Sequence, residues 1–115
     1  MTRNRTTARS AGQRWETAIV SFLVECGWRY AERRRLSGAN DKGDISGLPG
    51  VVIEAKDVAA IRLSEFVDEA ETEKDNANAA VGVAWIKRKG KSDPGEAYVV
   101  MTGNQFATLL RDAGY

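Results

Sequence analysis

The segment Val51–Lys56 constrains this chain most, because it combines a strand-forming sequence with two charged side chains. Its residues are Val-Val-Ile-Glu-Ala-Lys, and the β-branched content predicts a strand. Side chains alternate across a strand, so Glu54 and Lys56 share one face. A short strand between two helices is expected to be central and buried, where an unpaired charge costs several kcal/mol. The two charges therefore pair or bind something, unless the strand emerges into solvent at Glu54.

The remaining periodicity predicts an α/β domain. Helices are expected at residues 13–26, 63–70 and 104–112, and further strands at residues 28–34, 43–47, 80–87 and 96–101. The resulting order, α-β-β-β-α-β-β-α, is typical of a mixed sheet flanked by helices. Residues 1–9 have no apolar periodicity, so we expect a flexible basic tail followed by a single domain over residues 10–115.

Composition excludes several kinds of chemistry. The 115 residues contain no histidine and one cysteine, so an internal disulfide, a Cys/His zinc site, a Ser-His-Asp triad and an imidazole base are ruled out. Catalysis would have to use carboxylates, lysine, serine, tyrosine or a metal held by oxygen. No apolar run approaches the roughly 18 residues of a membrane span, and the basic start lacks the apolar core of a secretory signal. A cytoplasmic protein with no membrane partner is expected.

The near-neutral net charge of +1 hides a block pattern. Residues 1–40 carry net +5, residues 41–80 carry net −6, and residues 81–115 carry net +2. Two basic flanks around an acidic centre suit a protein that binds a polyanion and also holds divalent cations. A mixed, solvated surface accounts for the same blocks equally well.

Two further carboxylates can join Glu54. Asp44 precedes the turn at residues 48–50, which lets its segment pair back against Val51–Lys56 and brings its carboxylate to the same end of the hairpin. Two carboxylates and a backbone carbonyl make a hard oxygen site suited to Mg²⁺ or Mn²⁺. Glu16 borders the apolar face of the first helix, where a carboxylate needs a partner. A turn role for Asp44, and a rotation that clears Glu16 from the core, are the alternatives.

Four features occur in a recognisable order: Glu16, Arg33–Gly38, Asp44–Ile45 and Glu54–Lys56. In this order they resemble the PD-(D/E)xK nuclease superfamily and, within it, the small Holliday-junction resolvases of archaea and some phages. Gly43 stands where the superfamily name has a proline, and the chain after Lys56 is similar only in the order of its elements. The resemblance implies a restriction-endonuclease-like fold and a Mg²⁺-dependent endonuclease, with Mn²⁺ able to substitute and no nucleotide cofactor.

The resemblance also implies roles for individual residues. The metal ligands would be Glu16, Asp44, Glu54 and the Ala55 carbonyl. Lys56 would position the attacking water and help to deprotonate it, and Ser37 would belong to the catalytic loop. The basic residues expected to contact DNA are Arg14, Arg33, Arg34, Arg35, Lys42, Lys87, Arg88 and Lys89. For the cluster at residues 87–89, a simple role in keeping the protein soluble is the alternative.

By the same resemblance the substrate is branched DNA, cut as a four-way junction by a homodimer. A dimer also follows from size, because one chain has one such site and a junction needs two matched cuts. We expect its interface to include Trp85, Tyr98, Phe106 and Leu109. The alternatives are a nuclease of the same fold that cuts flaps, nicks or duplex DNA, and a non-catalytic DNA-binding module.

Overall fold

A computed structural model describes residues 4–34 and 41–115. Within these ranges the elements are α1 (Arg5–Glu25), β1 (Glu32–Arg33), β2 (Ile45–Ser46), β3 (Val51–Lys56), α2 (Leu63–Asn76), β4 (Val81–Ile86), the short 3-10 helix η1 (Pro94–Glu96), β5 (Tyr98–Val100) and α3 (Gly103–Asp112). The order of helices and strands is the predicted one, and the mixed α/β class is confirmed. None of the helices in the described ranges is long and apolar enough to cross a membrane.

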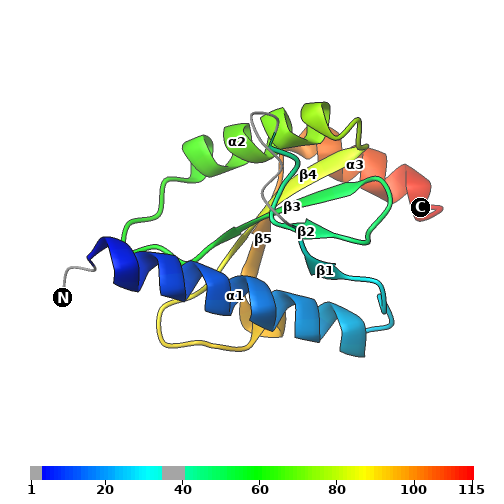
Figure 1. Ribbon diagram of the computed structural model, residues 1–115. Coiled ribbons are helices and arrows are strands. Elements are labelled where there is room, and N and C mark those ends of the chain that lie inside the picture. The colour runs from blue at the N-terminus through cyan, green and yellow to red at the C-terminus, as the bar shows by residue number, and fades with distance from the viewer. Residues whose placement is uncertain (1–3, 35–40) are drawn as a thin grey trace.

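The five strands form one sheet in the order β1-β2-β3-β4-β5, and β3 lies at its centre. Strands β3 and β4 are parallel, while the other neighbouring strands are antiparallel. Helix α1 covers one face of the sheet, and α2 and α3 lie on the other (Figure 1). This arrangement places β3 between helices on both faces, as its apolar sequence predicts.

Helix α1 begins earlier than expected. The Asn4 side chain accepts a hydrogen bond from the Thr7 N–H at 2.8 Å and caps the helix, which starts at Arg5. The expected tail over residues 1–9 is therefore wrong for residues 5–9, which form an exposed helical turn. Periodicity misses such a turn because it contacts no core; the buried face of α1 starts only at Ala11.

Strand β2 is held to two residues by the glycines on either side of it. Gly43 and Gly47 have φ angles of +94° and +92°, which residues with a Cβ atom rarely adopt. Strand β1 is also shorter than expected, at Glu32–Arg33, and pairs only with β2. This half of the sheet is therefore a narrow hairpin laid against the long central strand.

Helix α3 completes the pairing of β4. Strand β5 pairs with β4 only as far as Ala84, so the Gly82 N–H donates instead to the side-chain oxygen of Gln105 on α3. Gly82 also lets α2 pack closely, because a Cβ there would collide with the Ala70 carbonyl. Gln105 in turn donates from Nε2 to Glu71 Oε1 at 3.1 Å, which ties α3 to α2.

Trp85 belongs to the core. Its side chain is buried, and its ring meets that of Phe22 edge-on at a centroid distance of 5.8 Å. Its expected place in a dimer interface is therefore wrong, because this strand position faces α1. Tyr98, Phe106 and Leu109, the other residues assigned to that interface, are exposed.

Candidate metal centre

Gly43 brings the chain against β3 and positions Asp44. A Cβ on Gly43 would lie 2.8 Å from Val52 Cγ1 and 3.1 Å from the Ile53 carbonyl oxygen, so only glycine allows this approach. The Asp44 N–H donates to the Ile53 carbonyl at 2.9 Å, and Asp44 Oδ2 accepts from the Ala55 N–H at 2.8 Å. The Asp44 side chain thus accepts the hydrogen bond that a backbone carbonyl of a longer β2 would accept from Ala55. The expected pairing of the Asp44 segment with the Glu54 strand is confirmed.

Glu54 and Lys56 share the face of β3 that α2 covers. Lys56 Nζ lies 3.3 Å from Glu54 Oε1 and 2.8 Å from Glu69 Oε2 on α2. The same ammonium lies 5.0 Å from the centre of the Phe66 ring. Glu54 is only 5% exposed, which excludes the alternative that the strand emerges into solvent there.

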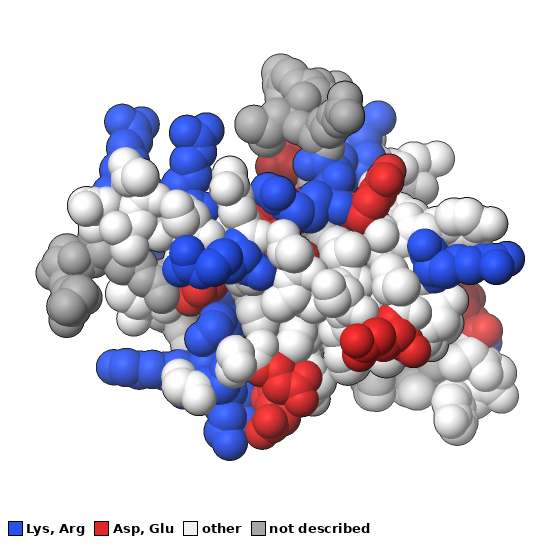
Figure 2. All heavy atoms as spheres, turned by 60° about the horizontal axis from the view of Figure 1, so that its bottom comes forward, with Lys and Arg blue, Asp and Glu red and all other residues white. Residues whose placement is uncertain are grey.

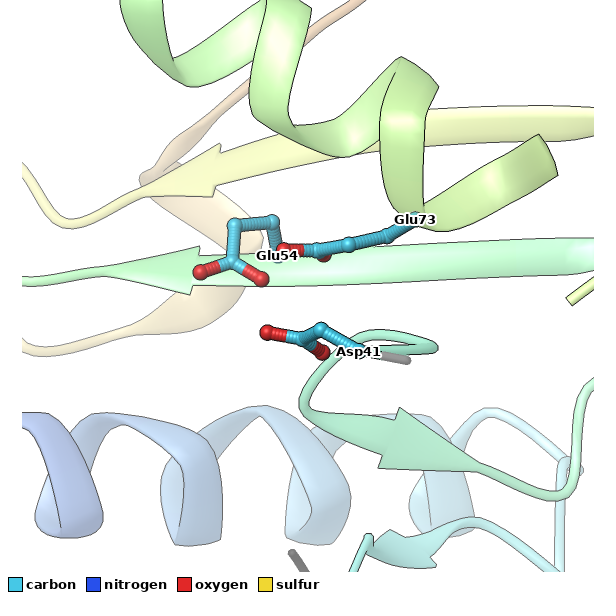
Figure 3. Close-up of side chains that lie close together, drawn as sticks. All are labelled: Asp41, Glu54 and Glu73. Atoms are coloured by element: carbon cyan, nitrogen blue, oxygen red, sulfur yellow. The ribbon is translucent and has the colours of Figure 1, made fainter. Parts of the chain in front are cut away.

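Glu54 also belongs to a group of three carboxylates. Asp41, Glu54 and Glu73 each place one carboxylate oxygen within 4.8 Å of the others (Figure 3). Figure 3 shows Glu54 on β3 and Glu73 on α2 pointing toward one another, with Asp41 reaching them from the loop before β2. Glu54 Oε2 and Glu73 Oε1 are buried without a hydrogen-bond partner. Unpartnered carboxylate oxygens in such a group fit a hard divalent cation such as Mg²⁺ or Mn²⁺.

The pKa values of three carboxyls at this site are raised, so their neutral, protonated forms are favoured. Burial and the charge of Glu54 raise the pKa of Asp44 to about 8. Burial, together with a hydrogen bond to Glu73, raises the pKa of Glu54 to about 9, and burial raises the pKa of Glu73 to about 7. Without a cation, burial and, to a smaller extent, mutual repulsion favour the protonated form of these carboxyls.

Lys56 stays protonated in this arrangement. Burial disfavours its charged form, but the hydrogen bond to Glu69 and the charge of Glu54 outweigh burial, so the net effect raises the pKa of Lys56. The ammonium can therefore orient a water or stabilise negative charge. The expected help in deprotonating a water does not fit this state, because a firmly held proton prevents Lys56 from accepting another.

Glu16 has a partner other than a metal. Its Oε1 accepts a hydrogen bond from Arg33 Nε at 3.0 Å, and it lies outside the three-carboxylate cluster. Its charge still contributes to the raised pKa of Asp44. The N–H and C=O of a strand residue point to the same neighbour, so the Ala55 carbonyl, like its N–H, points toward Asp44.

Arg33, the last residue of β1, and Arg34, which follows it, line different pockets. Arg33 pairs with Glu16 on α1 and lines a shallow pocket with Arg14. Arg34 lines a different pocket, of about 450 Å³, with Val52 and Ala77, and its Nε is buried without a partner. A single DNA-binding arginine cluster is therefore not formed by these two residues. Ser37 and Arg35 lie outside the described residues.

A second basic group lies at the Lys56 end of the sheet. Lys87, Arg88 and Lys89 follow β4, whose Ile86 pairs with Lys56 of the parallel strand β3. They line a pocket with residues 57–59, and Arg88 stacks on Tyr98 at 4.8 Å. Figure 2 looks toward α1 and shows most Lys and Arg side chains on the left half of this face. Lys42 is exposed beside Asp41.

Sequence reasoning missed Asp41, Glu69 and Glu73. Glu73 has a signal in the sequence, because Phe66, Ala70 and Glu73 follow the i, i+4, i+7 spacing of one helix face, and all three are buried. A carboxylate on an apolar stripe marks a candidate site. Asp41 has no such signal, since its place depends on how the loop lies against α2.

Comparisons with protein-family models, with curated proteins and with solved structures give no match. The chemistry of the site therefore rests on the geometry of its own residues.

The raised pKa values predict how stability depends on pH in EDTA. Asp44, Glu54 and Glu73 rise from ordinary values of 3.8 and 4.5 to about 8, 9 and 7, so the folded chain binds more protons than the unfolded chain. Their contribution is present below about pH 4 and is lost as pH rises toward about 9. Calorimetry should show a Tm that falls between about pH 6 and about pH 9, and a smaller fall for Glu54→Gln.

The control for this measurement is Asp68→Asn, which removes a charge from the exposed side of α2. Its pH profile should follow the wild type. Parallel profiles for the wild type and Glu54→Gln would mean that Glu54 ionises as freely as a surface carboxylate.

Proposed function

We propose that this protein is a divalent-cation-dependent endodeoxyribonuclease whose site is built on Asp44, Glu54 and Lys56. The observation that carries the proposal is the Asp44 carboxylate bonded to the Ala55 N–H, between Glu54 and Lys56 on β3. Acidic groups from β3 and from the residue before β2 thereby lie near a half-buried lysine. The element order and the mixed sheet support the restriction-endonuclease-like fold that the resemblance implies.

The chain's own residues have defined tasks in phosphodiester hydrolysis. Asp44, Glu54 and the Ala55 carbonyl would hold the ion, which polarises the phosphate and lowers the pKa of a bound water. The Lys56 ammonium, fixed by Glu54 and Glu69, orients that water and stabilises charge on the phosphate oxygens in the transition state. Glu16 holds Arg33 at the edge of the site, where its guanidinium can meet a neighbouring phosphate.

Branched DNA, with a four-way junction as the main candidate, is the proposed substrate. The support for this choice is the resemblance of Glu16, Arg33–Gly38, Asp44–Ile45 and Glu54–Lys56 to the small resolvases. Two copies would supply the two cuts, and the exposed apolar side chains of Tyr98, Phe106 and Leu109 offer a surface for pairing. Flaps, nicks or duplex DNA remain the substrates of the alternative form of this proposal.

Cleavage of junction, flap and linear duplex DNA, side by side in Mg²⁺ and in EDTA, tests the function. The wild type should cut the junction with paired nicks in Mg²⁺ only, and should scatter light as a dimer of about twice 12.6 kDa. Asp44→Asn and Glu54→Gln should abolish cleavage, because each removes a ligand charge. Lys56→Ala should lower the rate by roughly 10²-fold or more, because it removes a donor that stabilises charge in the transition state.

Asp68→Asn is the matched control and should cut at the wild-type rate. Flap cleavage by a monomer would move the assignment to the alternative substrates. Binding of DNA without cutting of any of the three, with Mg²⁺ or Mn²⁺, would make the protein a binding module and contradict the enzyme.

The basic group after β4 predicts a salt dependence of DNA binding. The double variant Lys87→Ala/Lys89→Ala should weaken binding and flatten the log–log salt slope by about 0.9 for each phosphate that the variant no longer neutralises. The control is Lys74→Ala/Arg111→Ala, which removes two cations from helices α2 and α3 instead. Equal slopes for the two double variants, measured by fluorescence anisotropy, would show that residues 87–89 face away from the DNA.

A further inference from the structure

Glu73 is the most buried acidic side chain of the described residues. It is 2% exposed, compared with 5% for Glu54, and it lies on the buried face of α2 together with Phe66 and Ala70. None of the described Lys and Arg side chains forms an ion pair with it, since Lys56 is held by Glu54 and Glu69 and Lys74 lies by Asp75. A carboxylate in such a place destabilises a core unless something else compensates it.

The geometry around Glu73 points into the cluster. Glu73 Oε1 and Glu54 Oε2 are both buried and unpartnered, and the two side chains face each other in Figure 3. The donors of the neighbouring backbone are already used elsewhere, as the Ala55 N–H bonds to Asp44. Apart from a proton that Glu54 can donate to Glu73, the space between the two side chains contains acceptors with no donor from the described chain.

Asp41 is held in place as the third acidic group. Its Oδ1 accepts a hydrogen bond from the Gly43 N–H at 2.8 Å, and its carbonyl accepts from Asn76 Nδ2 at 2.8 Å. Asn76 is the last residue of α2, so these bonds fix the loop before β2 to the helix that carries Glu73. The cluster is thus pre-organised from three separate elements.

We propose that Asp41, Glu54 and Glu73 form a binding site for a divalent cation such as Mg²⁺ or Mn²⁺. Glu54 belongs to this cluster, and its charge also acts on Asp44, so Glu54 links the two groups of carboxylates. The inference rests on the proposed function only in assigning Glu54 to a metal. It adds a ligand from α2 that the resemblance does not imply, and it makes α2 part of the metal centre as well as a cover for the sheet.

Titration of the DNA-free full chain with Mn²⁺ in a calorimeter tests this site. Glu73→Gln keeps the shape of the side chain but removes its charge, and should weaken Mn²⁺ binding at least tenfold or remove a bound ion. Asp41→Asn removes the charge of an exposed residue and should also weaken binding. Asp68→Asn, on the outer side of α2, should bind Mn²⁺ as the wild type does.

Thermal unfolding separates a ligand from a structural residue. In EDTA, Glu73→Gln should be at least as stable as the wild type, because it removes a buried charge. The increase in Tm on adding Mn²⁺ should be smaller for this variant than for the wild type. A residue with a purely structural role would instead lower the Tm in EDTA and leave the Mn²⁺ increase unchanged.

If Glu73→Gln and Asp41→Asn both bind Mn²⁺ as tightly as the wild type, the inference is wrong. Cleavage of the junction by the wild type in Mg²⁺ would still support the proposed function in that case. Conversely, Mn²⁺ binding that depends on Glu73, in a protein that cuts no DNA, would support the site and contradict the nuclease. The two claims are therefore distinguishable by the same set of proteins.

Discussion

The burial of the Glu54 carboxylate on the central strand is the constraint on which the rest of the site depends. Helices on both faces keep β3 from water, yet the strand carries an acid that is 5% exposed. Lys56 is the cation paired with it, and Glu69 shares that same ammonium. Burial raises the pKa of Asp44, Glu54 and Glu73, and the charge of neighbouring carboxylates raises it further. Protons or a cation must supply the missing positive charge.

The arrangement of the chain concentrates these acids at one place. The positive-φ glycine before Asp44 lets the hairpin approach β3, and the Asp44 side chain takes over a ladder bond where the backbone diverges. Helix α2 then covers the same end of the strand and contributes Glu69 and Glu73.

The features that local sequence determines were predictable. Strand β3 has the predicted bounds, because its β-branched residues are a local signal, and the Asp44 pairing followed from the turn at residues 48–50. The features that depend on packing were not. Glu73 joins the site because α2 packs on the sheet. Glu16 forms an ion pair with Arg33, and Trp85 is buried in the core. Helix α1 begins with an exposed turn that no apolar pattern marks.

Anomalous scattering from a crystal soaked in Mn²⁺ tests the central claim, that Glu54 is buried in order to hold a divalent cation. We expect an anomalous peak at ligand distance, about 2 Å, from a Glu54 carboxylate oxygen, and loss of that peak in Glu54→Gln. A crystal with Mn²⁺ peaks only at surface carboxylates, or with a peak unchanged in Glu54→Gln, would contradict the claim.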